Sequence, residues 1–112
     1  MPAVKEVDPA RIRRELGVTR KDFARLTGYS ERSIAAWEGG EAPSSKGLQR
    51  LNEVKRLRDA LANVIKPEHI ADWLKTPNDA FHGLKPLEVI ERGEADRIWK
   101  MIYYLESGTP ST

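Results

Sequence analysis

The side chains that most often catalyse reactions or bind metals are scarce in this chain of 112 residues. It has no cysteine, which excludes a thiolate nucleophile, a zinc–thiolate site and a disulfide. His69 and His82 are the only histidines. We interpret His69 and Asp72, three positions apart, as two exposed residues of one helix rather than as a ligand pair. No glycine-rich loop follows a strand pattern, as nucleotide binding would require. The sequence therefore predicts no enzyme, no metal and no cofactor.

Chemistry of another kind is concentrated in residues 19–40, which read TRKDFARLTGYSERSIAAWEGG. Arg20 and Lys21 begin a helical pattern, where free backbone N–H groups also favour phosphate. Arg32 lies on the outer face of a second helical pattern and could bind guanine O6 and N7. Ala36 could contact a thymine methyl group, and Glu31 could accept from a cytosine amine. The predicted DNA-binding residues are Arg20, Lys21, Ser30, Glu31, Arg32, Ser33 and Ala36.

Two short helices joined by a tight turn would position these side chains. Thr19 and Ser30 can each cap a helix, because their hydroxyls can accept from a free backbone N–H. Gly28 supplies the left-handed turn between the two helices. Ile34 and Trp37 share the inner face of the second helix, and glycines follow it. This is the pattern of a helix-turn-helix, whose second helix enters the DNA major groove.

The rest of the chain also predicts helices, because strand signals are nearly absent. We expect a helix from Asp8 to about Leu16 and a long one from Ser44 or Ser45 to about Ile65. Its apolar stripe would be Leu48, Leu51, Val54, Leu57, Leu61 and Ile65. After a break at Pro67, Pro86 opens a helix that Gly93 closes, and a last helix runs from about Glu94 to Leu105, closed by Gly108. The expected fold is all-α, with a helix-turn-helix bundle at 1–66 and a small helical unit at 67–112.

Charge is distributed unevenly between these two segments. Residues 1–66 hold 14 Lys and Arg against 9 Asp and Glu, a net charge of +5. Residues 67–112 hold 5 against 8, a net charge of −3. A basic front segment suits the phosphate backbone of double-stranded DNA, and an acidic back segment does not.

The last expected helix is apolar on more than one face, so it must bury several sides. A unit of this size offers little interior, and the surplus favours an interface, where aromatic side chains and Met are common. The predicted interface, with a partner protein or with a second copy of the chain, consists of Trp99, Ile102, Tyr103, Leu105, Glu106, Ser107 and Gly108.

No signal-peptide pattern is found at the N-terminus. The longest strongly apolar run is MIYYL at 101–105, too short to span a bilayer. The sequence therefore predicts a cytoplasmic protein without a membrane partner.

Residues 19–40 resemble the Xre family of helix-turn-helix proteins, which includes phage repressors. The matching residues are Arg13, Ala24, Gly28, Ser30, Ile34, Trp37, Glu38 and Gly39. The resemblance implies a structural ion pair between Arg13 and Glu38, which would keep both residues away from the bases. Thr27 departs from the pattern, which usually has an aliphatic residue there.

Residues 67–108 resemble the toxin-binding domain that Xre, MbcA and ParS antitoxins share. The matching residues are Trp73, Leu74, Pro77, Asn78, Gly83, Pro86, Leu87, Gly93 and Gly108. His82 departs from the pattern, in which a small residue is common. Together the two resemblances are those of an antitoxin from a RES–Xre toxin–antitoxin pair. They imply a homodimer that represses its own operator and a cognate RES-domain toxin that consumes NAD, while this chain itself binds no NAD.

Two other functions stay open on the sequence alone. A stand-alone transcriptional repressor would use residues 67–108 only to dimerise. An interaction scaffold would retain the fold with a decayed DNA face, which Glu31 and Thr27 mildly favour.

Overall fold

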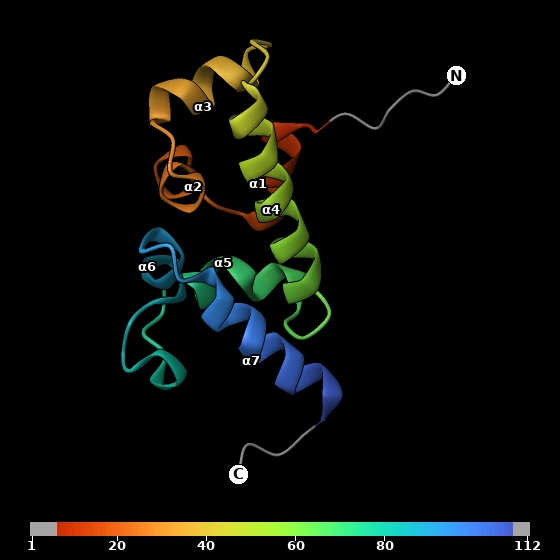
Figure 1. Cartoon of the computed structure of the whole chain (residues 1–112), viewed down its shortest axis with the longest axis vertical. Coiled ribbons are helices and arrows are strands. Elements are labelled where there is room, and N and C mark those ends of the chain that lie inside the picture. Colours follow the sequence, from red (N-terminus) through yellow and green to blue (C-terminus); the bar gives the residue numbers. More distant parts are fainter. Residues whose placement is uncertain (1–6, 109–112) are drawn as a thin grey trace, which may run out of the picture.

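The structure is a computed structural model that describes residues 7–108 (Figure 1). Within this range all regular secondary structure is helical, so the all-α prediction is confirmed. The elements are α1 (Pro9–Leu16), α2 (Arg20–Thr27), α3 (Glu31–Glu38), α4 (Ser45–Leu61), η1 (Pro67–His69), α5 (Ile70–Leu74), η2 (Asp79–Phe81), α6 (Pro86–Glu91) and α7 (Ala95–Ser107).

Helix α1 begins and ends where the sequence predicts. The Asp8 carboxylate accepts from the N–H of Arg11 at 3.2 Å, and Pro9 occupies the first helical position. Gly17 ends the helix in the left-handed conformation, with φ of 74°. Its N–H donates to the carbonyls of Arg13 and Arg14, which the helix leaves without an internal partner.

Helix α4 is shorter than the apolar stripe suggested. It ends at Leu61, and the chain turns so that the N–H groups of Val64 and Ile65 donate to the Leu61 carbonyl. Pro67 limits how far a helix could extend, because it disfavours helical backbone at the preceding residue. Lys66 accordingly has ψ of 133°.

The first turn of α4 lies at the edge of the core. Leu48, which the sequence placed in the buried stripe, is 38% exposed, so that expectation is wrong. Its neighbour Gly47 is buried, and a Cβ there would lie 3.1 Å from the Trp37 ring and 3.2 Å from Pro43. Glycine therefore allows α4 to pack tightly against α3.

The C-terminal unit folds through two tight turns. Asn78, which follows Pro77, accepts from the N–H of Ala80 at 2.9 Å and so caps η2. His82 follows in the left-handed region, with φ of 56°, and is the only described residue other than glycine with a positive φ. Glycine adopts this backbone without steric cost, and His is one of the few other residue types that tolerate it, so the fold accommodates the departure seen in the sequence.

One hydrophobic core joins the two units. Its buried side chains come from α1 through α7, and α6 packs on α2 while α7 packs on α4 (Figure 1). A small, mostly apolar cleft is lined from both units, by Leu16, Leu26, Val54, Leu57, Arg58, Leu61, Leu74 and Ile90. The core is therefore continuous across residue 66, where the sequence placed a boundary.

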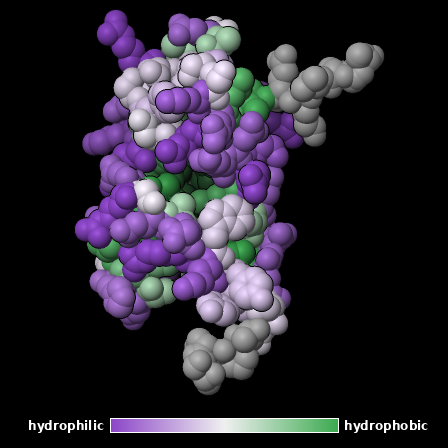
Figure 2. All heavy atoms as spheres, viewed as in Figure 1, coloured by the Kyte–Doolittle hydropathy of each residue, from purple (hydrophilic) through white to green (hydrophobic). Residues whose placement is uncertain are grey.

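The exposed surface is mostly hydrophilic around this core. Figure 2 shows polar side chains over most of one face and apolar side chains recessed at its centre. Between residues 7 and 108, no helix combines the length and the apolar character that a membrane crossing needs.

Candidate functional site

Helices α2 and α3 form the expected helix-turn-helix. The Thr19 hydroxyl accepts from the N–H of Asp22 at 3.1 Å, and the Ser30 hydroxyl accepts from the N–H of Ser33 at 3.0 Å. Gly28 lies between the helices with φ of 81°. Thr27 is buried and donates its hydroxyl to the Phe23 carbonyl at 3.0 Å. A local hydrogen bond therefore satisfies the hydroxyl where an aliphatic residue is usual.

The two faces of α3 separate as the helical pattern predicts. Ile34 and Trp37 are buried, and the Trp37 ring packs 5.0 Å from that of Tyr29. Glu31 and Arg32 are exposed, while Ser33, Ala35 and Ala36 are half-buried. The hydroxyl of Ser33 also bonds to that of Ser30 at 3.1 Å. Arg32 is thus the long cationic side chain that α3 offers to a nucleic acid.

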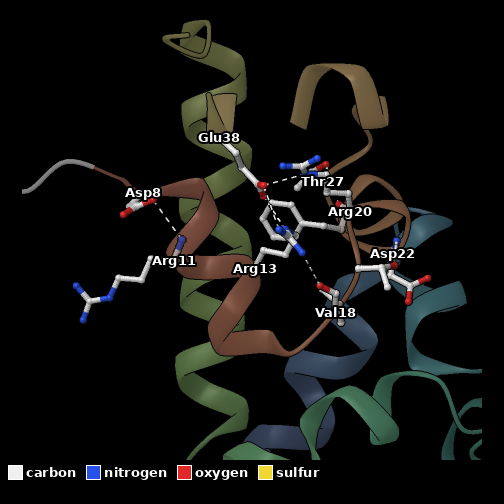
Figure 3. Close-up of polar contacts among 10 residues, drawn as sticks. Asp8, Arg11, Arg13, Val18, Arg20, Asp22, Thr27 and Glu38 are labelled. Carbon is white, nitrogen blue, oxygen red and sulfur yellow. Dashed lines mark hydrogen bonds and ion pairs between the residues drawn. The ribbon is translucent and has the colours of Figure 1, made fainter. Parts of the chain in front are cut away.

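Glu38 is the polar centre of this unit and lies at the end of α3 (Figure 3). Its carboxylate accepts from Nε and Nη2 of Arg13 at 2.6 and 3.1 Å, so the structure brings the implied ion pair together. Arg13 also donates to the carbonyl of Val18 at 3.2 Å. The Glu38 side chain is only 6% exposed. The hydrogen bond from Arg13 therefore holds the pKa of the Glu38 carboxyl below its usual value, against the opposing effect of burial.

Arg20 is attached to the same carboxylate, which the sequence did not predict. Its Nε donates to Oε1 of Glu38 at 2.9 Å, and half of its side chain is exposed. Within the described part of the chain its terminal guanidinium nitrogens make no hydrogen bond. Glu38 therefore holds Arg20 at the start of α2 with its outer nitrogens free. Lys21 is exposed beside it.

Two ion pairs connect α2 to the C-terminal unit, and neither was predicted from the sequence. Lys75 Nζ lies 3.0 Å from Oδ2 of Asp22, whose side chain is 10% exposed. Arg25 Nη2 donates to Oε1 of Glu91 at the end of α6, at 2.8 Å. Their partners are about 50 or more residues apart, so only the tertiary fold brings them together.

Helix α7 presents a different surface. Ile98 and Ile102 are buried in the core, while Trp99, Tyr103, Tyr104 and Leu105 are exposed. The expectation that Ile102 lies in an interface is therefore wrong, because that side chain is only 2% exposed and faces the core. Tyr103 is 65% exposed, and its ring contacts that of Tyr104 with centroids 5.6 Å apart.

The exposed end of α7 continues into an open groove beside η2. Phe81, Met101, Tyr104 and Leu105 supply its apolar surface, and the charged side chains of Arg97 and Lys100 lie along it. Arg97 also lies over the Phe81 ring, 5.7 Å from its centroid. Glu106, Ser107 and Gly108 are exposed beyond this groove. Tyr104 was missed among the candidate site residues, although its position in an apolar helix was the available signal.

Metal ligands do not come together in the described residues. No group of three or more His, Cys, Asp or Glu side chains is placed to hold an ion there. His69 and Asp72 are both exposed.

The fold, with Arg20, Lys21 and Arg32 exposed on α2 and α3, defines a helix-turn-helix protein with a second helical unit packed against it. Residues 10–54 match a helix-turn-helix family. Residues 56–108 match the family described as the Antitoxin Xre/MbcA/ParS C-terminal toxin-binding domain. The two matches meet inside α4, upstream of the boundary expected at residue 66.

Individual relatives agree with these matches. The chain is 31% identical over 94 residues to the mycobacterial cidal antitoxin MbcA of Mycobacterium tuberculosis, covering 83% of each chain. MbcA of Mycobacterium bovis matches to the same extent. The fold is also similar to a chain in the crystal structure of the M. tuberculosis MbcT–MbcA toxin–antitoxin complex, with a TM-score of 0.73 and 28% identity, covering 91% of this chain and 93% of that one. The chain therefore belongs to the Xre/MbcA/ParS family of antitoxins.

Proposed function

We propose that this chain is the antitoxin of a toxin–antitoxin pair, that it neutralises a RES-type, NAD-consuming toxin in the cytoplasm, and that a homodimer of it represses its own operon. One observation carries the proposal: the chain matches, over most of its length, an antitoxin whose structure is solved in complex with its toxin. The toxin-binding family match over residues 56–108 favours this function over a stand-alone repressor.

The toxin would bind at the exposed end of α7. Trp99, Tyr103, Tyr104 and Leu105 leave apolar surface in water there, as interface residues do before they bind. A cleft built for a dinucleotide with two phosphates would be electropositive, so the acidic end at Glu106 suits it. Arg97 and Lys100 oppose this attraction along the groove, so the electrostatic part of the contact is confined to the end of the helix.

Operator DNA would bind at α3 and at the start of α2. Arg32 would read a base edge, and Arg20 and Lys21 would bind phosphates. In a homodimer, two α3 helices would enter successive major grooves about one turn of DNA apart. The operator would then be a pseudo-palindrome.

Co-expression with the cognate toxin tests the antitoxin function. Full-length chain is expected to preserve cellular NAD and growth, whereas a chain lacking residues 106–112 is expected to lose this protection. A chain lacking only residues 109–112 is the matched control, because it keeps Glu106, Ser107 and Gly108.

Each part of the proposal can fail separately in this experiment. Failure of the full-length chain to protect would refute the antitoxin function. Growth arrest by the toxin without loss of NAD would refute the RES-type assignment. Full protection by the chain lacking 106–112 would move the inhibitory contact to the apolar side of α7.

A further inference from the structure

A groove beside the turn between α2 and α3 is lined by both units of the protein. Lys21, Ser30 and Glu31 of the candidate DNA face line it, and Glu91 from the end of α6 lies among them. The Glu91 carboxylate, which belongs to the C-terminal unit, therefore lies at the edge of the surface that would approach DNA phosphates.

Glu91 is paired with a cation of the same surface. Arg25 lies one helical turn after Lys21 on α2, and its Nη2 donates to the Glu91 carboxylate at 2.8 Å. The hydrogen bond from Arg25 lowers the pKa of the Glu91 carboxyl, and the same bond raises the pKa of Arg25. Both groups are therefore charged at neutral pH, and one terminal nitrogen of the guanidinium, Nη2, is engaged by an anion as it would be by a phosphate.

The magnitude of the contact argues against a purely structural role. The side chains of Arg25 and Glu91 are 35% and 46% exposed, and solvent screens an ion pair this exposed so that it adds little to the stability of the fold. The shared core already attaches α2 to the C-terminal unit, and so does the ion pair between Lys75 and the nearly buried carboxylate of Asp22. Removing the Arg25–Glu91 pair should thus leave the fold intact.

We propose that Glu91 lowers the affinity of this protein for DNA by holding Arg25 in the place of a DNA phosphate. The inference rests on the proposed DNA binding and deepens it. Glu91 at the end of α6, inside the segment that matches the toxin-binding family, would reduce the number of phosphate contacts that the DNA face makes. With Glu91 neutral, Arg25 becomes a further phosphate contact next to Lys21.

The test is a titration of wild type and Glu91→Gln with a random-sequence duplex and with a duplex from the chain's own promoter, between about 50 and 200 mM salt. The variant should bind both duplexes about three- to tenfold more tightly, and its salt slope should steepen by about 0.9, the value of one added phosphate contact. Glu68→Gln is the matched control, because it removes one negative charge from an exposed residue of η1 that has no described partner. Its salt slope should equal that of wild type.

Arg25→Ala identifies the cation responsible. In the Glu91→Gln background it should remove the whole gain in affinity and restore the shallower slope. Thermal unfolding of each variant checks that the fold is retained, and Glu91→Ser gives a second, independent reading.

Two results would overturn the inference, and they are distinguishable. If wild type binds DNA and Glu91→Gln behaves like Glu68→Gln, Glu91 does not restrain Arg25 and the proposed DNA binding stands. If no variant binds either duplex at any salt concentration, the proposed DNA binding itself fails, and this inference fails with it.

Discussion

The N-terminal and C-terminal units differ in how their helices are specified. Each of the helices α1 to α4 begins at a side chain that accepts a hydrogen bond from the backbone: Asp8, Thr19, Ser30 and Ser44. Helices α5 and α7 begin without such a bond. Helix α6 begins at Pro86, and the Glu88 carboxylate in its first turn accepts from the N–H of Lys85 at 2.8 Å. Side-chain caps therefore specify the helices of the first unit more completely than those of the second, which shares its core with the first.

Their surfaces differ as well. The outer face of α2 and α3 presents charged side chains, with Glu38 holding two arginines in place. The exposed end of α7 presents aromatic and aliphatic side chains instead. A charged, rigid face suits a polyanion, and an apolar end suits a protein partner.

The largest change in stability is expected for a core residue of α7, in contrast to its exposed neighbour. Ile102→Ala should lower the free energy of unfolding by about 2–5 kcal/mol, because its side chain is buried and leaves a cavity. Tyr103→Ala, at the next position, should change it by at most about 0.5 kcal/mol. Urea unfolding of both variants measures this difference. Equal losses would contradict the assignment of Ile102 to the core.

The next effect concerns the ion pair that organises the N-terminal unit. Arg13→Met should cost about 3 kcal/mol of stability, since it leaves a nearly buried carboxylate with Arg20 as its remaining partner. Arg14→Met is the control, because Arg14 is exposed and has no described ion-pair partner. Similar stability of the two variants would show that Glu38 does not need Arg13.

A smaller effect tests the DNA face. Arg32→Ala should cost roughly 1–3 kcal/mol of binding and relax the preference at one base pair. Arg20→Ala should weaken binding to all sequences about equally and flatten the salt slope. Operator titrations at several salt concentrations distinguish the two outcomes. Unchanged binding by both variants would refute this assignment of the face.

The smallest effect is a dependence of stability on pH. The pKa of Glu38 is lowered in the folded state. The ionised carboxylate therefore stabilises the fold at pH values above 4.5, the ordinary pKa of a glutamate. This contribution is fully present at neutral pH and is lost as the pH falls below about 4.5 and through the lowered folded-state value. Urea unfolding at several acidic pH values should show a shallower loss of stability for Glu38→Gln than for wild type. Parallel curves would exclude Glu38 as a source of the dependence.

The sequence predicted most of the N-terminal unit because its signals are local. A capping hydroxyl and a turn glycine each act within a few residues, so Thr19, Gly28 and Ser30 could be interpreted without a structure. The pairs Arg25–Glu91 and Asp22–Lys75 could not, because nothing local relates their partners. The error at Ile102 has the same origin: an apolar run does not reveal which of its faces the rest of the chain covers. The exposed residues Trp99, Tyr103 and Leu105 remain a proposal for the toxin interface.

Toxin binding and DNA binding are expected to use separate surfaces of this protein. The most direct test measures the affinity of Tyr103→Asp/Leu105→Asp and of Arg32→Ala for both the purified cognate toxin and operator DNA. The α7 variant should lose about 2 kcal/mol or more of toxin binding and keep its operator affinity, and Arg32→Ala should do the reverse. Undiminished toxin binding by the α7 variant would contradict this expectation.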